Sequence, residues 1–397
     1  MQIFPITAPA GVLAVLTGIC AVFFWLESST RSRLFQYLPP LVFIYLTPVI
    51  FTNTGVLPAA SPAYDAIKQF ALPMMLVLML LNVDVARAVR LVGRGVGVML
   101  FGALGIVVGM GVGFAVVRHW LEPGAWKSFG ALAGSWVGGT GNLGAVSTAL
   151  QASGVEEALA IMADTAWLLV WLPVMLSSRK FAAPFARFAR VDPERVAEMD
   201  AAMAADVRSE RVATYKDYLA LLFVGFTVTA VAKFATGAIG EALAQHGRYW
   251  PSQFSEDTFY ILIITTIGIA LSFTPLRRIP ASRELAMALI FLYMARTGAT
   301  ADLSKAAEQA IPFLIGAGIA ITIHGLFCLL GAKLLHADIH TAAIASAANI
   351  GGIATATCVA AHHKEGLMPS AILLALLGYA LGNYAGLLAA WLCQTIA

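Results

Sequence analysis

The chain has 397 residues, of which 59% are hydrophobic and only 12% are charged, and its formal net charge is +3. Soluble domains carry roughly 25% charged residues, so this composition excludes an ordinary soluble protein and indicates a polytopic helical membrane protein. The apolar runs are too long and continuous for a membrane β-barrel, and so small a net charge does not indicate a nucleic-acid partner.

Apolar runs of roughly 20 residues, the length that crosses a bilayer as a helix, follow one another along the chain. The first run is interpreted as a retained span and not as a cleaved signal peptide, because no basic region precedes it and the first charge is Glu27. An all-α fold is therefore expected. The predicted spans, in chain order, are 6–26, 35–51, 66–83, 96–117, 129–150, 158–176, 218–238, 258–273, 285–299, 311–335, 342–361 and 371–392.

The stretch 178–216 interrupts this series of spans. Its Lys and Arg residues are interleaved with acids and predict a solvated linker in the cytoplasm, because basic loops are retained on that side of a membrane. A polar helix is expected near 194–207. The linker divides the chain into a first membrane repeat, 1–177, and a second membrane repeat, 217–397.

One glycine-rich pattern occurs in both repeats. Residues 139–149 match residues 346–356, with Asn142 aligned on Asn349. Glycine has a low helix propensity, and hydroxyl and amide side chains bond the backbone groups that unwinding releases. Each motif therefore predicts a broken membrane helix, and two such helices in corresponding positions of two halves are typical of a transporter binding site.

Two shorter matches support the repeat, because 51–52 corresponds to 273–274 and 82–85 to 300–303, in the same order. Six spans in each half would make the halves parallel, whereas transporters with broken helices usually have inverted repeats. One predicted span is therefore expected to be wrong or to lie outside the repeat. The segment 84–95, which carries three arginines, is interpreted as an interfacial amphipathic helix.

Residues 139–142 and 348–352, together with 300–303, resemble the DUF819 (YjcL-like) family of membrane proteins, and the resemblance extends over essentially the whole chain. That family is similar to the larger superfamily of cation:proton antiporters and anion transporters, which includes bile acid:sodium symporter-like proteins. The resemblance implies two inverted repeats, a core or transport domain, a panel or scaffold domain, and two broken helices that cross at mid-membrane. It also implies elevator-type alternating access and a homodimer, but it indicates no substrate.

Asn142 and Asn349 are the first candidate binding residues. A buried amide costs several kcal/mol unless it is hydrogen-bonded, so each is expected either to coordinate a cation with its side-chain oxygen or to bond the broken backbone of the partner helix. Hydroxyl groups in the same segments could join them, although most hydroxyls in membrane helices bond their own backbone. These further candidates are Ser135, Thr140, Thr148, Ser346, Thr355 and Thr357.

Asp164 is interpreted as the only carboxylate well inside an apolar span. An ionisable group in a membrane is a functional hypothesis by default, and either a proton or a bound cation would offset its charge. With Asn142 and Asn349 it is expected to form a sodium site. Thr165 could add a further oxygen, and Asn383 occupies a comparable place in the last span. The alternative is that Asp164 lies near the outer interface or pairs structurally.

Other polar residues receive structural interpretations. Asp84 and Asp302 end their spans and are expected to cap the next segment. Arg296 is expected to extend toward the interface, and His324 to be a hydrogen-bonded core residue. The adjacent histidines 362–363 are not spaced like metal ligands on a helix.

The expected function is secondary active transport of a small anionic solute, coupled to sodium or protons. A cation/proton antiporter is the alternative, and an intramembrane enzyme or a channel is more remote, because the sequence carries no nucleotide-binding or catalytic motif. No cofactor is expected besides Na⁺ or H⁺ as the coupling ion. The expected partners are the solute, the lipid bilayer of the bacterial inner membrane and a second copy of the chain.

Overall fold

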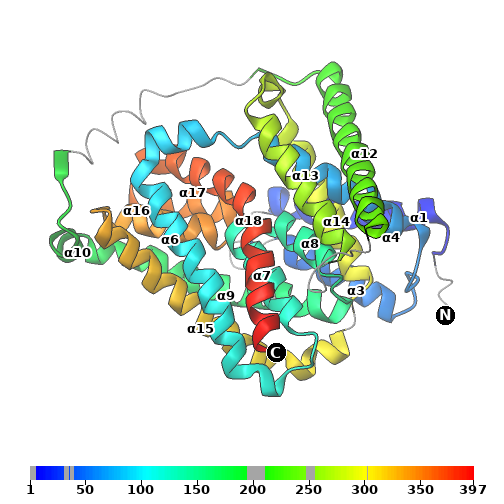
Figure 1. Ribbon diagram of the computed structural model, residues 1–397, viewed down its shortest axis with the longest axis horizontal. Coiled ribbons are helices and arrows are strands. Elements are labelled where there is room, and N and C mark those ends of the chain that lie inside the picture. Colours follow the sequence, from blue (N-terminus) through cyan, green and yellow to red (C-terminus); the bar gives the residue numbers. More distant parts are fainter. Residues whose placement is uncertain (1–5, 31–34, 36–39, 195–210, 247–254, 302) are drawn as a thin grey trace.

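The computed structural model describes residues 6–30, 35, 40–194, 211–246, 255–301 and 303–397. Over these residues the chain is helical and contains no strand (Figure 1), which confirms the predicted all-α fold. Seven of the described helices are long and apolar enough to cross a membrane. The protein is therefore a polytopic membrane protein.

Each predicted span coincides with one helix or with a pair of short helices. The first half contains α1 (Pro9–Thr30), α3 (Pro40–Asn53), α4 (Pro62–Ala66), the π-helical turn η1 (Ile67–Ala71), α5 (Leu72–Leu81), α6 (Val85–Val117), α7 (Trp126–Gly138), α8 (Thr140–Ala149) and α9 (Gly154–Ser177). Helix α10 (Ala182–Ala189) lies in the linker between the halves. The second half contains α12 (Tyr215–Gln245), α13 (Glu256–Ser272), α14 (Ser282–Ala299), α15 (Leu303–Leu334), α16 (Ile339–Asn349), α17 (Gly352–His363) and α18 (Met368–Ile396).

Polar caps fix where several helices begin. Asp84 Oδ1 accepts a hydrogen bond from the backbone N–H of Arg87 at 3.1 Å, which confirms the predicted cap of α6. Ser153 and Glu156 form a reciprocal capping box at the start of α9. Asp302, the other predicted cap, lies outside the described residues.

The interfacial position predicted for the segment 84–95 stays a prediction. The segment is set off from the long part of α6 by a kink. It forms the first turns of α6, which bends at Val92, where φ is −127° and ψ is 25°. The carboxylate of Asp84 also forms an ion pair with Arg277, with 3.1 Å between Oδ2 and Nη1. This contact places the start of α6 beside the end of α13.

The direction of each helix follows from contacts between helix ends. We use the name linker face for the face of the molecule at which α9 ends and α12 begins. The start of α6 lies there, because Arg94 donates to the carbonyl of His336, and the ring of His336 contacts the carbonyl of Ala189 in α10. The opposite face carries the start of α9, where Gly154 packs against the Thr300 carbonyl at the end of α14.

The first glycine-rich segment, 129–150, folds back on itself. Lys127 at the start of α7 donates from Nζ to the backbone oxygen of Gln151, just after α8, at 3.0 Å. Between these ends, Gly134 of α7 faces Val146 of α8. Helices α7 and α8 therefore form a hairpin, which we name the first hairpin, whose ends lie at the face opposite the linker.

The second glycine-rich segment, comprising α16 and α17, forms a hairpin from the other side. The Nδ1 atoms of His340, at the start of α16, and His363, at the end of α17, lie 2.9 Å apart. The Lys364 ammonium lies 4.0 Å from the Asp338 carboxylate beside them. His363 Nε2 is also 3.0 Å from the carbonyl oxygen of Met175 near the end of α9, so the ends of this second hairpin lie at the linker face.

The two hairpins correct the predicted topology. Both helices are broken as expected, but neither crosses the membrane as a single span, so the expected crossing of two broken helices is replaced by two tips that meet. Among the described helices, five segments of each half run between the faces, namely α1, α3, α4–α5, α6 and α9, and α12, α13, α14, α15 and α18. Inverted repeats require an odd number of crossing segments in each half. With this number, the arginines of 84–95 lie at the linker face together with the other basic residues.

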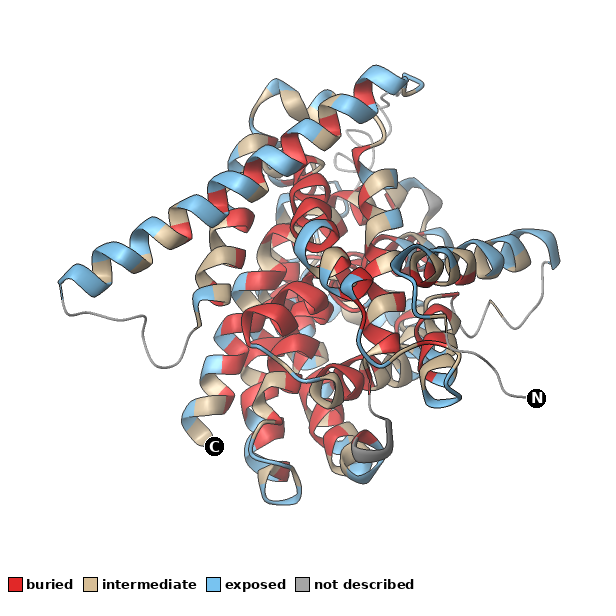
Figure 2. Cartoon of the chain, turned by 90° about the vertical axis from the view of Figure 1, so that its right-hand side faces the viewer, coloured by how far each residue is buried: buried red, intermediate tan, exposed pale blue. Residues whose placement is uncertain are grey.

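The helices form two groups. The core group contains α6, α9, α15, α18 and both hairpins, and small residues bring its backbones together. A Cβ on Gly109 of α6, for example, would lie 2.7 Å from the carbonyl oxygen of Ala320 in α15. The flanking group contains α1, α3, α4, α5, α12, α13 and α14, in which α14 packs on α3 and α5, and α13 packs on α5. Figure 2 shows the buried residues concentrated in the interior of the molecule.

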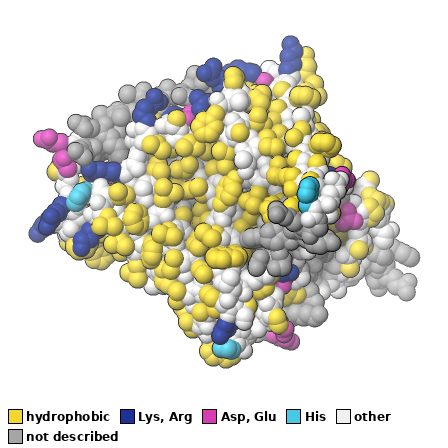
Figure 3. Space-filling model, viewed as in Figure 1, with side chains coloured by type: hydrophobic (Ala, Val, Ile, Leu, Met, Phe, Trp, Pro, Cys, Tyr) yellow, Lys and Arg dark blue, Asp and Glu magenta, His cyan; other side chains and the backbone are white. Residues whose placement is uncertain are grey.

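Apolar side chains cover much of the outside. Figure 3 shows them over most of one face, with Lys and Arg gathered at its edges. Phe234 of α12 and Ile311 of α15 are 79% and 72% exposed. An apolar surface of this extent, bordered by basic residues, is what a lipid bilayer covers.

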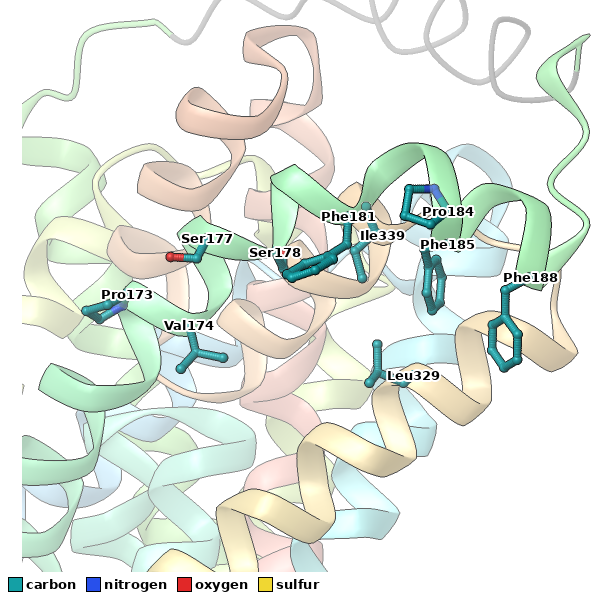
Figure 4. Close-up of a pocket in the computed structure, with 10 residues that line it drawn as sticks. All are labelled: Pro173, Val174, Ser177, Ser178, Phe181, Pro184, Phe185, Phe188, Leu329 and Ile339. Carbon is teal, nitrogen blue, oxygen red and sulfur yellow. The ribbon is translucent and has the colours of Figure 1, made fainter.

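Most residues at the beginning of the predicted linker, 178–190, are exposed. Helix α10 packs on α15 and α16, and Figure 4 shows Phe185 and Phe188 directed toward α15. With Phe181 and Leu329 they line an apolar groove of about 720 Å³. The solvated linker stays a prediction, and the predicted polar helix near 194–207 lies almost entirely outside the described residues.

Candidate functional site

The first hairpin breaks at Gly139, which has φ +77° and ψ −179°. Glycine adopts this backbone without steric cost, so the glycine of the motif sets the position of the break. The N–H of Gly139 donates to the Ser135 carbonyl at 2.6 Å and ends α7, while its own carbonyl accepts from the Asn142 N–H at 3.0 Å and starts α8. Ser135 and Asn142 therefore flank the tip on its two arms.

The second hairpin breaks at Gly351 and Gly352, with φ +128° and +66°. Both motifs thus break their helices as predicted. Asn349 is the last residue of α16 and precedes its break, whereas Asn142 follows the break of its hairpin. The predicted alignment of Asn142 on Asn349 therefore does not match the structure, in which the two amides lie on different arms.

The two tips approach each other at Tyr379 of α18. A Cβ on Gly139 would lie 3.3 Å from Cε1 of the tyrosine ring, and a Cβ on Gly352 would lie 3.9 Å from its hydroxyl. The Tyr379 side chain therefore lies beside both breaks, with its ring next to Gly139 and its hydroxyl next to Gly352. Helices α8 and α17 each begin at a break, so the partial positive charges of two helix N-termini lie close to this ring.

Both asparagines are fully buried and use their amide N–H groups to hold a hairpin to its neighbour. Asn142 Nδ2 donates to the carbonyl of Tyr379 in α18, and Asn349 Nδ2 donates to the carbonyl of Met99 in α6, each at 3.0 Å. Their Oδ1 atoms are buried and have no hydrogen-bond partner within the described part of the chain. Buried polar atoms are normally paired, so these two oxygens are available to a ligand.

Asp164 of α9 lies beside the first tip. Its Oδ2 accepts a hydrogen bond from Ser135 Oγ at 3.1 Å, and Ser135 itself is buried. No cation of the described residues forms an ion pair with this carboxylate. A carboxylate in this situation is suited to bind a proton or a metal cation.

Ser346 lies one turn before the second tip and joins three helices. Its Oγ is 2.8 Å from Nε2 of His324 in α15 and accepts a hydrogen bond from Nε1 of Trp171 in α9 at 3.0 Å. The other ring nitrogen of His324 is 2.9 Å from the carbonyl oxygen of Gly102 in α6. His324 is therefore the hydrogen-bonded core residue that was predicted. Its ring also holds the side chain of Ser346, a predicted site residue, in place.

Three predicted threonines lie on the second arms of the hairpins. Thr140 is the first residue of α8 and is partly exposed. Thr355 of α17 is buried, with its Oγ1 directly against Gly351 at the break. Thr148 lies farther along α8, where its hydroxyl is 3.2 Å from that of Tyr293 in α14. Thr140 and Thr355 thus belong to the tips, and Thr148 does not.

Three other predicted residues have hydrogen-bond partners outside the two hairpin tips. Thr165 and Thr357 donate to carbonyls one turn back in their own helices, at 3.0 and 2.9 Å. Asn383 of α18 is buried and donates from Nδ2 to Thr265 Oγ1 of α13 at 2.7 Å, so it joins the core group to the flanking group. The two threonine hydroxyls are therefore engaged within their own helices, whereas the buried Oδ1 of Asn383 has no hydrogen-bond partner in the described part of the chain.

Sequence reasoning missed Tyr379 and Glu157. Nothing local marks Tyr379, because only the tertiary structure brings two glycines to its ring. Glu157 is 5% exposed, and the predicted span 158–176 began one residue beyond it. Asp164 is therefore not the only carboxylate in buried surroundings, and it is itself partly exposed.

No group of three His, Cys, Asp or Glu side chains that could hold a metal ion occurs among the described residues. A sodium ion would rely on Asp164 together with neutral oxygens, as hard cations do. The unpartnered Oδ1 of Asn142, on the same hairpin as Ser135, fits that requirement. The sodium site of Asn142, Asp164 and Asn349 stays a prediction.

Comparison with known proteins gives two matches. The family described as "Protein of unknown function (DUF819)" matches residues 14–395. The "Uncharacterized membrane protein YjcL" of Bacillus subtilis (strain 168) is 26% identical over 356 residues, which cover 85% of each of the two chains. The similarity therefore spans both halves, with both hairpins and the linker between them.

Proposed function

The chain belongs to the DUF819 family of membrane proteins, and we propose that it is a secondary active transporter of a small solute, coupled to sodium or protons and without enzymatic activity. The observation that carries this proposal is the meeting of two hairpin tips, from opposite faces, at Tyr379. Interrupted helices with available polar groups inside a membrane protein are the usual construction of a transporter site.

The tips offer binding groups of both signs. The N-termini of α8 and α17 favour an anionic group, and the unpartnered oxygens of Asn142 and Asn349 favour a cation or an N–H donor. An anionic solute that binds together with a cation suits both sets of groups. Asp164, beside the first tip, is the residue through which the cation or proton gradient acts in this proposal.

The two helix groups support an elevator mechanism. The core group carries both tips, while the flanking helices pack on one another. In our proposal the core group slides along the flanking group and exposes the tips to one face at a time. The packing of α3 on α14 and of α5 on α13 is the pairing expected of inverted repeats. A homodimer in the bacterial inner membrane, with the basic linker in the cytoplasm, completes the proposal.

A cation/proton antiporter is the second candidate. The observation that favours it is a second buried carboxylate, Glu157, seven residues before Asp164 on α9. Seven residues are about two helical turns, so the two acids lie on one face of the helix. An antiporter would exchange a cation for a proton without carrying a solute.

Uptake by the purified protein in liposomes tests both candidates. A panel of small carboxylates, inorganic anions and amino acids would be offered with a sodium gradient, a proton gradient or neither. We expect accumulation of one class of solute that requires one gradient. Sodium-dependent proton movement without any solute would favour the antiporter. Behaviour identical to that of empty liposomes under every gradient would overturn the proposal of transport.

A further inference from the structure

Glu157 lies where the core group meets the flanking group, on the side opposite the linker. It is in the first turn of α9 and 5% exposed. The one hydrogen bond recorded to its carboxylate comes from Thr297 Oγ1 of α14, at 3.4 Å. The start of α9 touches the end of α14, where Gly154 packs against the carbonyl of Thr300. The carboxylate is thus enclosed between the two groups of helices.

Charged and phenolic groups surround this carboxylate from three elements. Arg296 of α14 and Lys68 of η1 are close enough for their charges to act on it, but neither forms an ion pair with it. The buried phenols of Tyr45 in α3 and Tyr293 in α14 are also close enough for the charge of Glu157 to act on them. The Tyr45 hydroxyl is buried and has no hydrogen-bond partner in the described part of the chain. The negative charge of Glu157 is therefore only partly compensated.

A row of hydroxyl groups leads from Glu157 toward the surface. Thr297 lies one helical turn after Tyr293, so the two side chains lie on the same face of α14. The Tyr293 hydroxyl is 3.2 Å from Thr148 Oγ1 of α8. Hydroxyl groups donate and accept at once, so such a row can pass a proton along.

The outer end of this row opens into a cavity. Thr148 lines a cavity of about 590 Å³, together with Lys68, Lys233, Asp257 and other residues of η1, α12 and α13. The start of α13 lies at the face opposite the linker, because Ser255 Oγ donates to the carbonyl of Ala149 at the end of α8. The cavity therefore lies near that face, with Thr148 in its wall.

The inner end of the row leads on to the tips. Asp164 lies seven residues after Glu157 on the same helix, which is roughly 10 Å along its axis. Glu157 therefore stands between the cavity and the carboxylate beside the first tip. No other described acid occupies such an intermediate position on α9, since Glu156 is held by the capping box.

We propose that Glu157 is a proton-binding site that exchanges protons with the cavity through Thr148, Tyr293 and Thr297. A proton from cavity water passes to Thr148, each hydroxyl hands its own proton to the next, and Thr297 delivers one to the carboxylate, which becomes a neutral carboxylic acid. Release follows the reverse path. The role of this site in coupling rests on the proposed transport function: a neutral acid can move along the apolar contact of the two groups, whereas a charged one cannot.

Infrared spectroscopy of the purified protein in nanodiscs tests proton binding without any solute. Protonated carboxyl groups give a carbonyl band that titrates with pH and shifts in deuterium oxide. Glu157→Gln should remove one such band, while Glu156→Gln, the matched control, should keep it because glutamine preserves the capping box. Tyr293→Phe should keep the band but slow its shift after mixing with deuterium oxide, because it interrupts the row.

Several outcomes would overturn the proposal. A Glu157→Gln spectrum that equals that of the wild type at every pH would show that Glu157 binds no proton. If this variant does not fold, Glu157→Asp should move the band, and an unmoved band would have the same meaning. If the band titrates but no solute is taken up, the proton site is supported and the transport function is wrong. If solute is taken up but no band titrates, transport is supported and the proton site is wrong.

Discussion

The two hairpins have the same construction but different surroundings. The first, α7 and α8, places Ser135 against the Asp164 carboxylate. The second, α16 and α17, has no carboxylate at its tip among the described residues, and its Ser346 is held by the rings of His324 and Trp171. The unpartnered asparagine oxygen lies after the break in the first hairpin and before it in the second.

This difference suits the two tips to different ligands. A carboxylate beside a hydroxyl and a free amide oxygen suits a cation, so we assign the proposed ion coupling to the first hairpin. Neutral N–H and hydroxyl groups around the second tip suit the polar groups of a solute. Repeated motifs in a sequence therefore need not supply equivalent sites. The following experiments would break or sharpen this comparison, from the largest expected effect to the smallest.

Cysteine labelling tests whether the hairpins come from opposite faces, with an all-or-none result. In a background without the native cysteines, Glu122→Cys and Gln151→Cys lie at the two ends of the first hairpin and should react from the same side of the membrane. His362→Cys, at the end of the second hairpin, should react only from the other side. If Glu122→Cys and Gln151→Cys react from opposite sides, the segment crosses the membrane once and the hairpin is wrong.

Removal of the Asp164 charge tests the assignment of coupling to the first hairpin. Asp164→Asn should keep the fold and abolish gradient-driven accumulation in liposomes, because the amide offers the cation or proton no negative charge. Ser346→Ala, the comparison in the second hairpin, should weaken solute affinity and keep the dependence on the gradient. Unchanged ion and pH dependence in Asp164→Asn would make that residue structural.

Alanine at the breaks tests how far each tip depends on glycine. Gly351→Ala and Gly139→Ala should each lower the free energy of unfolding by about 1–3 kcal/mol, since their backbone angles are strained for other residues. The larger loss is expected at Gly351, where a Cβ would also meet the Thr355 side chain. Gly237→Ala on α12, where a Cβ meets nothing within 4 Å, is the control and should not destabilise. Thermal unfolding in detergent measures all three, and equal stability would contradict the strained tips.

The smallest effects are expected at hydroxyls whose hydrogen-bond partners lie outside the two hairpin tips. Thr165→Val and Thr357→Val should change stability by less than about 0.5 kcal/mol and leave transport unchanged, because each hydroxyl only donates to its own helix. Uptake kinetics and thermal unfolding of both variants would check this. A loss of ion dependence in Thr165→Val would return this residue to the site beside Asp164.

The sequence by itself determined the membrane class, the position of the helices and the two places where they break. Apolar runs fixed the helices, because a bilayer requires uninterrupted apolar segments of a set length. Gly139 and Gly351 fixed the breaks, since only glycine adopts their backbone angles without strain. The Asp84 cap was predictable for the same reason, because one side chain bonds its own backbone three residues on.

Only the tertiary structure decided which way the chain runs after each break. A glycine permits a kink or a reversal equally, and the choice depends on whether the two arms can pack, as they do where Gly134 faces Val146. The reversal at each break makes the number of crossing segments odd in each half. The predicted spans gave an even number, which conflicted with inverted repeats. The tertiary structure also placed Tyr379 at both tips and enclosed Glu157 under α14, because such contacts join residues far apart in the chain and no local pattern encodes them.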